Sequence, residues 1–149
     1  MRRHYGSWLR RLVSGGVTLT PLEAALMEGF VAGVPEEIGK PLAAQLKAIN
    51  RARRSRDGTA LRFDRLRGLR PDGSDLPPLP VTPGEAKLMT VEFVVPGTER
   101  TLTASFRAVG RQFCRIDFSE NLRPFGDAVP RVTGVQPSWR ESIVQVRAA

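Results

Sequence analysis

Arginine is the residue type through which this sequence could act chemically at a surface. The chain has 149 residues, with 23 lysines and arginines against 15 aspartates and glutamates, a net charge of +8. Residues 51–70 contain eight arginines but only two acids, Asp57 and Asp64. A guanidinium group can donate two parallel hydrogen bonds to a carboxylate or a phosphate. The candidate partner-binding residues are therefore Arg51, Arg53, Arg54, Arg56, Arg62 and Arg65.

Three interpretations of this arginine segment remain open. It could bind the acidic surface of a protein partner, it could bind nucleic acid, or it could be a solvated basic helix end without a partner. No RNA-binding aromatic signature and no recognition-helix motif accompanies the arginines. We therefore take a protein partner as the first hypothesis and nucleic acid as the alternative.

The other reactive side chains do not form a recognisable catalytic set. His4 is the single histidine and Cys114 the single cysteine, while Asp117, Glu120 and Asp127 belong to an expected solvated strand end and loop. The glycine-rich phosphate loops, HExxH helices and paired-cysteine spacings that carry cofactor or metal chemistry are missing from the sequence. We predict no catalytic residue, no cofactor and no metal ligand, which favours a non-enzymatic protein over an enzyme.

The elements that would position the arginines centre on residues 86–118, where apolar and polar residues alternate with the period of a strand. Two strands flank the turn sequence Pro96-Gly97-Thr98-Glu99. A four-residue loop at this turn and the apolar pattern select the same register. The predicted pairs are Met89 with Phe106, Val91 with Ala104, and Phe93 with Leu102.

A third strand is expected over residues 112–118, and its register decides which charges are buried. A two-residue turn at Gly110 and Arg111 would pair Phe106 with Arg115 and bury charge, at a cost of several kcal/mol. We therefore predict an odd-length loop or a bulge that pairs Phe106 with Cys114 instead. The predicted inward face is Met89, Val91, Phe93, Val95, Leu102, Ala104, Phe106, Ala108, Cys114, Ile116 and Phe118.

Two helices are expected before the sheet. Thr20, Pro21 and Glu23 form the signature of a capping box with proline at the first helical position, which predicts a helix from Pro21 to about Gly33. A second helix is predicted from Pro41 to about Arg53. Its end would place arginines at the negative pole of the helix dipole.

The remaining segments are predicted as follows. Leu61 and Phe63 are predicted to belong to a short strand. The five prolines of residues 68–84 predict a long loop without regular structure. The side chains of Leu122 and Phe125 are expected to pack against the core. Residues 138–147 could begin with a capping box, but their β-branched residues favour an extended segment. Residues 1–16 are expected to form an amphipathic basic arm, which could dock on the domain, contact a membrane or act in targeting.

Length and composition predict one domain, residues 1–149, with no transmembrane segment. A single cysteine is typical of a reducing compartment, so we expect a cytoplasmic, bacterial-type protein. Helices followed by an antiparallel meander predict a two-layer α+β domain. This element order resembles that of cystatin-like and nuclear-transport-factor-like folds, in which a curved sheet wraps a helix. The resemblance covers residues 20–118, and it implies a sheet whose apolar concavity could hold a ligand or only the helix.

These observations lead to one main functional hypothesis. We expect a small non-enzymatic partner-binding protein, of the kind that bacterial toxin immunity proteins and assembly adaptors represent. The alternatives are a basic nucleic-acid-binding protein that uses residues 51–70, and a ligand carrier or enzyme with an apolar cavity in the sheet. The sequence leaves the oligomeric state open.

Overall fold

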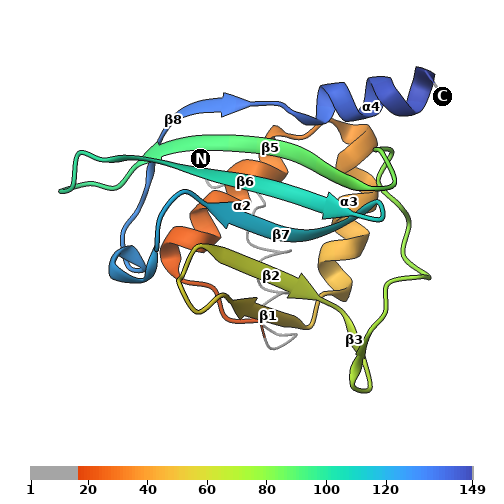
Figure 1. The fold of residues 1–149 in the computed structure, drawn as a ribbon, viewed down its shortest axis with the longest axis horizontal. Coiled ribbons are helices and arrows are strands. Elements are labelled where there is room, and N and C mark those ends of the chain that lie inside the picture. Colours follow the sequence, from red (N-terminus) through yellow and green to blue (C-terminus); the bar gives the residue numbers. More distant parts are fainter. Residues whose placement is uncertain (1–16, 149) are drawn as a thin grey trace.

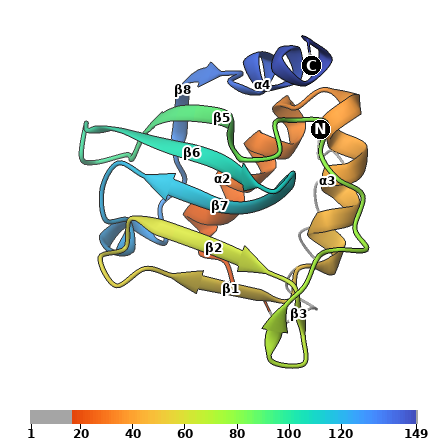
Figure 2. The same cartoon turned by 45° about the vertical axis from the view of Figure 1, so that its right-hand side comes forward.

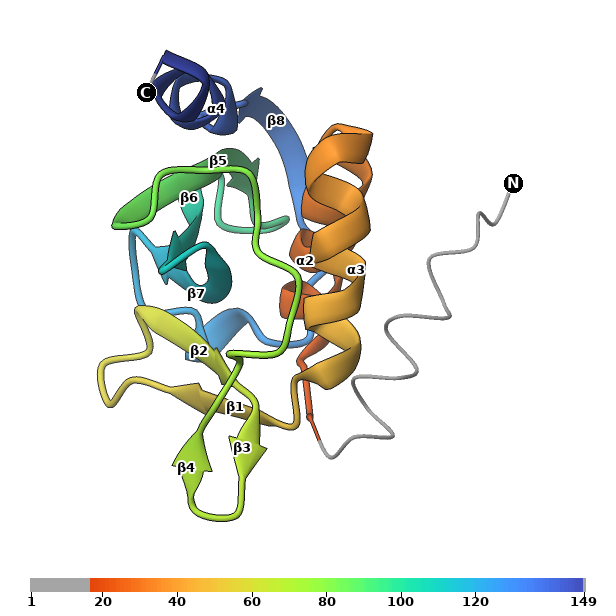
Figure 3. The same ribbon diagram turned by 90° about the vertical axis from the view of Figure 1, so that its right-hand side faces the viewer.

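The structure, a computed structural model, describes residues 17–148 and has two helices, α2 and α3, packed on one face of an antiparallel sheet (Figure 1). The strand order of the six-stranded sheet is β1-β2-β7-β6-β5-β8. Figure 3 shows α2 and α3 together on one side of this sheet. The predicted two-layer α+β architecture is confirmed. The sheet strands are β1 (Arg51–Arg54), β2 (Ala60–Asp64), β5 (Glu85–Val94), β6 (Thr101–Val109), β7 (Gln112–Phe118) and β8 (Arg131–Gln136).

Helix α2 (Pro21–Gly33) begins and ends where the sequence predicts. The Thr20 N–H donates to Glu23 Oε1 at 2.9 Å, and the Glu23 N–H donates to Thr20 Oγ1 at 3.2 Å, so the capping box is complete. Leu22, Leu26 and Phe30 are fully buried against the sheet. The concave side of the sheet is therefore filled by the apolar face of this helix.

Helix α3 (Glu36–Ala48) corrects the prediction of a helix over residues 41–53. It starts after Pro35 and contains Pro41, because burial of the apolar stripe Ile38, Leu42 and Leu46 outweighs the local cost of a proline inside a helix. The helix also ends earlier than predicted, and Arg51–Arg54 form strand β1 instead. The arginines therefore lie on a sheet and do not interact with a helix dipole.

Gln45 joins α3 to two distant parts of the chain although its side chain is buried. Its amide nitrogen donates to the carbonyls of Pro77 (2.8 Å) and Arg111 (3.2 Å), and its oxygen accepts from the Phe113 N–H at 2.9 Å. All three bonds are long-range in sequence. Gln45 thus fixes the proline-rich loop and the β6–β7 turn against the helix layer.

The central hairpin has the predicted register. Met89 pairs with Phe106, Val91 with Ala104, and Phe93 with Leu102. The predicted inward residues of β5 and β6 are all buried. A bulge between Lys87 and Met89 places the extra residue Leu88 in the core as well.

The third strand is bulged, as predicted, but the bulge lies elsewhere and the predicted pairing is wrong. Gly110 and Arg111 form a tight turn with φ of 59° and 63°, and the bulge follows within β7, so that Phe106 pairs with Ile116. Cys114 is the extra residue and is only half-buried, whereas Phe113 is buried. An aromatic side chain buries much more apolar area than a thiol, which favours this arrangement.

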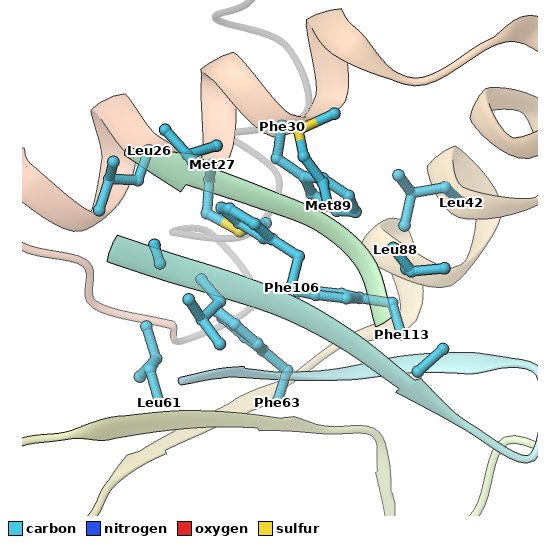
Figure 4. Packing of buried hydrophobic residues seen from close by; sticks show 14 of the residues in the cluster. Leu26, Met27, Phe30, Leu42, Leu61, Phe63, Leu88, Met89, Phe106 and Phe113 are labelled. Carbon is cyan, nitrogen blue, oxygen red and sulfur yellow. The ribbon is translucent and has the colours of Figure 1, made fainter. Parts of the chain in front are cut away.

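The rings of four phenylalanines form the centre of the core (Figure 4). Phe30 stacks on Phe106 with centroids 4.3 Å apart, and Phe113 lies 5.3 Å from both Phe30 and Phe63. These rings come from α2, β6, β7 and β2. The cluster therefore ties the helix layer to the middle of the sheet and fixes which sheet face points outward.

The periphery holds one further correction within residues 68–84. Strand β4 (Arg70–Pro71) lies in this region and pairs with β3 (Leu66–Arg67), so the region is not wholly irregular, and its Leu79 and Val81 are buried. Leu122 is buried and Phe125 packs against the core, as predicted.

The C-terminal segment is a helix, α4 (Trp139–Ala148), and the predicted extended segment is wrong. Its Ile143 is buried and its Ser142 Oγ accepts from the Thr82 N–H at 3.1 Å, so packing overrides the strand preference of the β-branched residues. Residues 1–16, the predicted arm, lie outside the described residues. None of the described helices is long and apolar enough to cross a membrane.

Candidate anion-binding face

The outer face of the sheet carries a row of five cations. Successive strand pairings place Arg53 opposite Arg62, Arg62 opposite Arg115, Arg115 opposite Arg107, and Arg107 opposite Lys87. We call these five residues the basic row. Neighbouring strands are about 4.8 Å apart, so the row crosses five strands over about 19 Å.

The basic row points away from the helices because its neighbours along each strand point toward them. Ala52, Leu61, Phe106 and Ile116 are buried or packed against the core. In Figure 1 the sheet lies in front of α2 and α3, and no described element crosses the front of its central strands. Within residues 17–148 no helix or strand covers the row, and its Arg53, Arg62 and Lys87 are exposed.

Two carboxylates hold the middle of the row in place. Arg107 lies 2.7 Å from Asp117 and 3.3 Å from Glu85, while Arg115 lies 3.0 Å from Asp117 and 2.8 Å from Glu85. The two arginine side chains are only 26% and 22% exposed. A network of four charges in a partly buried setting limits the rotamers of both arginines.

The positive charges on either side of this central pair have fewer carboxylate partners. Asp64 lies 3.2 Å from Arg51 and 3.6 Å from Arg53. Within the described residues, Arg62 and Lys87 have no carboxylate within ion-pair distance. The basic face, defined as the basic row with Arg51, Asp64, Glu85 and Asp117, holds six cations and three carboxylates and has a net charge of +3.

The structure brings together only part of the predicted arginine set. Arg51, Arg53 and Arg62 lie on the basic face. Arg54 points to the helix side and pairs with the buried Glu23, Arg56 lies in the β1–β2 turn, and Arg65 pairs with Asp75 at 2.5 Å. Residues that are close in sequence are thus distributed over two faces and a turn.

Sequence reasoning missed Lys87, Arg107 and Arg115 as members of this face. The strand alternation does place Arg107 and Arg115 outward, and that is the signal that could have found them. Their alignment with the arginines of β1 and β2 required the strand order and both bulges, which come from long-range packing.

The remaining candidate reactive groups in the described part of the chain lie at separate places. Burial raises the pKa of the Cys114 thiol, whose Sγ lies 3.8 Å from the Arg107 carbonyl oxygen. Cys114 lines a cavity of about 220 Å³ together with Gln45, Phe63, Asp72 and Gln112. Asp117 belongs to the basic face and Glu120 pairs with Arg100 at 2.6 Å. No cluster of three or more metal-ligating side chains occurs in the described part of the chain.

Comparisons with protein families, with curated protein sequences and with solved structures give no significant match for this chain.

Proposed function

We propose that this chain is a small non-enzymatic protein that docks an acidic protein surface onto its basic face. The observation that carries this proposal is the basic row, in which five adjacent strands each contribute one cation at the same level of the sheet. Directly opposed like charges destabilise a sheet. A partner that supplies carboxylates would relieve that cost on binding.

The side-chain composition of the outer face favours a protein partner over single-stranded nucleic acid. Around the basic row the outward positions are Ser105, Thr103, Thr90 and Glu92, with no aromatic residue on the outward side of the described strands. Proteins that bind single strands stack bases on exposed aromatic rings. The polar outer face lacks such a platform.

The proposal includes the kind of protein and its compartment. Bacterial toxin immunity proteins and assembly adaptors are partner-binding proteins of this type, and the free thiol of Cys114 fits a reducing compartment such as the cytoplasm. The filled concave side, where Leu22, Leu26 and Phe30 lie, supports a surface function over that of a ligand carrier.

A charge-reversal experiment tests the proposal. The double variant Arg62→Glu with Lys87→Glu alters the two row members without a carboxylate partner, and the control Lys47→Glu with Arg70→Glu makes the same change in net charge elsewhere. Each protein serves as bait in a native lysate, and its binding to fluorescent poly-L-glutamate and to a 20-nucleotide oligomer is titrated by anisotropy. We expect the first variant alone to lose an acidic protein partner and at least about tenfold in peptide affinity.

Three results would overturn this assignment. Equal loss in both double variants would show that only net charge matters. Tighter binding to the oligonucleotide, with a salt slope near the number of phosphates neutralised, would make nucleic acid the ligand. A nearly salt-independent affinity would exclude exposed charge as the basis of binding.

A further inference from the structure

Strand β8 forms one edge of the sheet, and its edge is chemically unlike the opposite one. Figures 1 and 2 show β8 as the outermost strand beyond β5. The other edge, β1, has the sequence Arg-Ala-Arg-Arg, whereas β8 contains a single charge, Arg131. Pro130 and Pro137 bound the strand on either side. The backbone donors and acceptors of β8 that do not bond β5 are thus available at a nearly neutral edge, which a bulge at Thr133 interrupts.

Two valines are exposed on the same side of this edge. Val132 pairs with Phe93 and Val135 with Val91, so both lie on the helix-side face despite their odd spacing, because a register shift intervenes. They are 49% and 54% exposed. An exposed apolar edge strand is a template for pairing with another strand, and here the flanking prolines and the bulge at Thr133 limit that pairing to the short segment between them.

We propose that β8 pairs antiparallel with β8 of a second copy of this chain, which joins the two sheets into one across a two-fold axis. Charge favours this partner. Antiparallel self-pairing places the two Arg131 residues at opposite ends of the ladder, about 17 Å apart. Pairing of two β1 edges would instead oppose Arg51, Arg53 and Arg54 with one another. A β1–β8 contact would be head-to-tail and would add copies in a ring or filament rather than form a two-fold dimer.

The two-fold pairing also covers the exposed valines. On the helix side, Val132 of one copy lies opposite Val135 of the other, and Val135 lies opposite Val132. Side chains directly opposite on neighbouring strands make contact. A single strand pair buries less than the roughly 1,200 Å² or more typical of stable interfaces. The dimer should therefore be reversible, with a dissociation constant on the order of 10 µM.

The dimer would enlarge the basic face, a consequence that rests on the proposed function. A two-fold axis perpendicular to the sheet leaves both outer faces on the same side. One outer face measures about 19 Å by about 30 Å, or about 600 Å². This area is smaller than the contribution of about 800 Å² that each partner makes to a standard interface, and the pair of faces exceeds it.

Sedimentation velocity at concentrations from about 5 to about 200 µM, which bracket the expected dissociation constant, tests the dimer without any partner. The wild-type mass should rise with concentration from 16.4 kDa toward twice that value. The variant Val135→Lys should remain monomeric. The control Leu69→Lys, at a site 98% exposed in the β3–β4 turn, should dimerise like the wild type. A wild type that stays monomeric at the highest concentration, or equal behaviour of the two variants, would overturn the proposal.

Cross-linking locates the interface independently. In a Cys114→Ser background, Thr133→Cys places a thiol near the two-fold axis and should give a covalent dimer on oxidation. Arg53→Cys, on the opposite edge, should not. Cross-linking through Arg53→Cys alone would assign the contact to β1 and refute the β8 interface. If Val135→Lys is monomeric but still binds poly-L-glutamate, the dimer and the anion-binding function are independent, so failure of one does not refute the other.

Discussion

Arg62 and Arg115 lie directly opposite each other on β2 and β7, and no carboxylate among the described residues is within ion-pair distance of Arg62. Arg115 is held by Asp117 and Glu85, which leaves the Arg62 charge uncompensated. Opposed like charges are unfavourable by up to about 1 kcal/mol. Such a pair on the outer face lowers the stability of the free protein.

Replacement of Arg62 by threonine should therefore stabilise the protein. We expect the free energy of unfolding at low salt, about 20 mM, to rise by about 0.5 kcal/mol, and the gain to shrink at about 0.5 M salt because salt screens exposed charges. Urea denaturation at both salt concentrations measures this. The same variant should bind poly-L-glutamate more weakly. Arg131→Thr removes an arginine that does not oppose another arginine, so this control should not show the same gain in the free energy of unfolding. A destabilised Arg62→Thr protein would contradict the like-charge argument.

Arg54 should behave in the opposite way, because it contributes to stability through a pair on the helix side of the sheet. Its guanidinium donates to both carboxylate oxygens of Glu23, at 2.9 Å for Nε, and to the Thr18 carbonyl at 2.9 Å. Glu23 is buried, and loss of Arg54 would leave its carboxylate without a cationic partner, although it still accepts from the Thr20 N–H. Because the Arg54 side chain is 35% exposed, we expect Arg54→Met to cost about 2 kcal/mol rather than the full penalty of a buried pair.

The measurement for Arg54 is urea denaturation, with Arg56→Met as a matched control in the neighbouring turn. The control should stay within about 0.5 kcal/mol of the wild type. Equal losses in the two variants would mean that the Arg54–Glu23 pair contributes nothing specific. Poly-L-glutamate binding should change little in either variant, since neither residue belongs to the basic face.

Local signals predicted those parts of the fold that depend on neighbouring residues. The capping box at Thr20 and the register of Phe93 with Leu102 follow from turn and cap chemistry within a few residues. The start of α3 and the helical state of α4 did not follow, because burial of Ile38 and Ile143 by distant strands overrides local preference.

The sequence predicted the kind of side chain at the candidate site, but not how these side chains are arranged. Arginine richness of residues 51–70 indicated anion binding, but the sequence could not show that Arg54 turns inward to Glu23. It also could not align Arg62 with Arg115, since that pair depends on β7 lying between β2 and β6, or Arg107 with Arg115, since that pair depends on the bulge at Cys114. Strand order is a long-range property that single-sequence patterns do not encode.

The Asp57 carboxyl should titrate unusually low. Hydrogen bonds from Ser55 and Thr59 lower its pKa to about 2 from the ordinary value of 3.8. A depressed pKa in the folded state means that the contribution to stability is present above about pH 4 and is lost as the pH falls toward about 2. Carboxyl ¹³C NMR should show this midpoint, and Ser55→Ala should raise it. Asp72, whose pKa is lowered mainly by Ser74, is the internal control and should not respond. An unchanged Asp57 midpoint would contradict the assignment.

The final prediction tests the register of β7, on which the alignment of the basic row depends. Phe113 is 4% exposed and contacts the rings of Phe30 and Phe63, whereas Cys114 is the half-buried bulge residue. Phe113→Ala should therefore cost about 3 to 5 kcal/mol, because it leaves a cavity in the aromatic cluster, while Cys114→Ala should cost less than about 1 kcal/mol. Denaturant unfolding of both variants measures the difference. A larger loss at Cys114 than at Phe113 would restore the pairing of Phe106 with Cys114, which sets Arg115 opposite Ser105, and would remove Arg115 from its place beside Arg107.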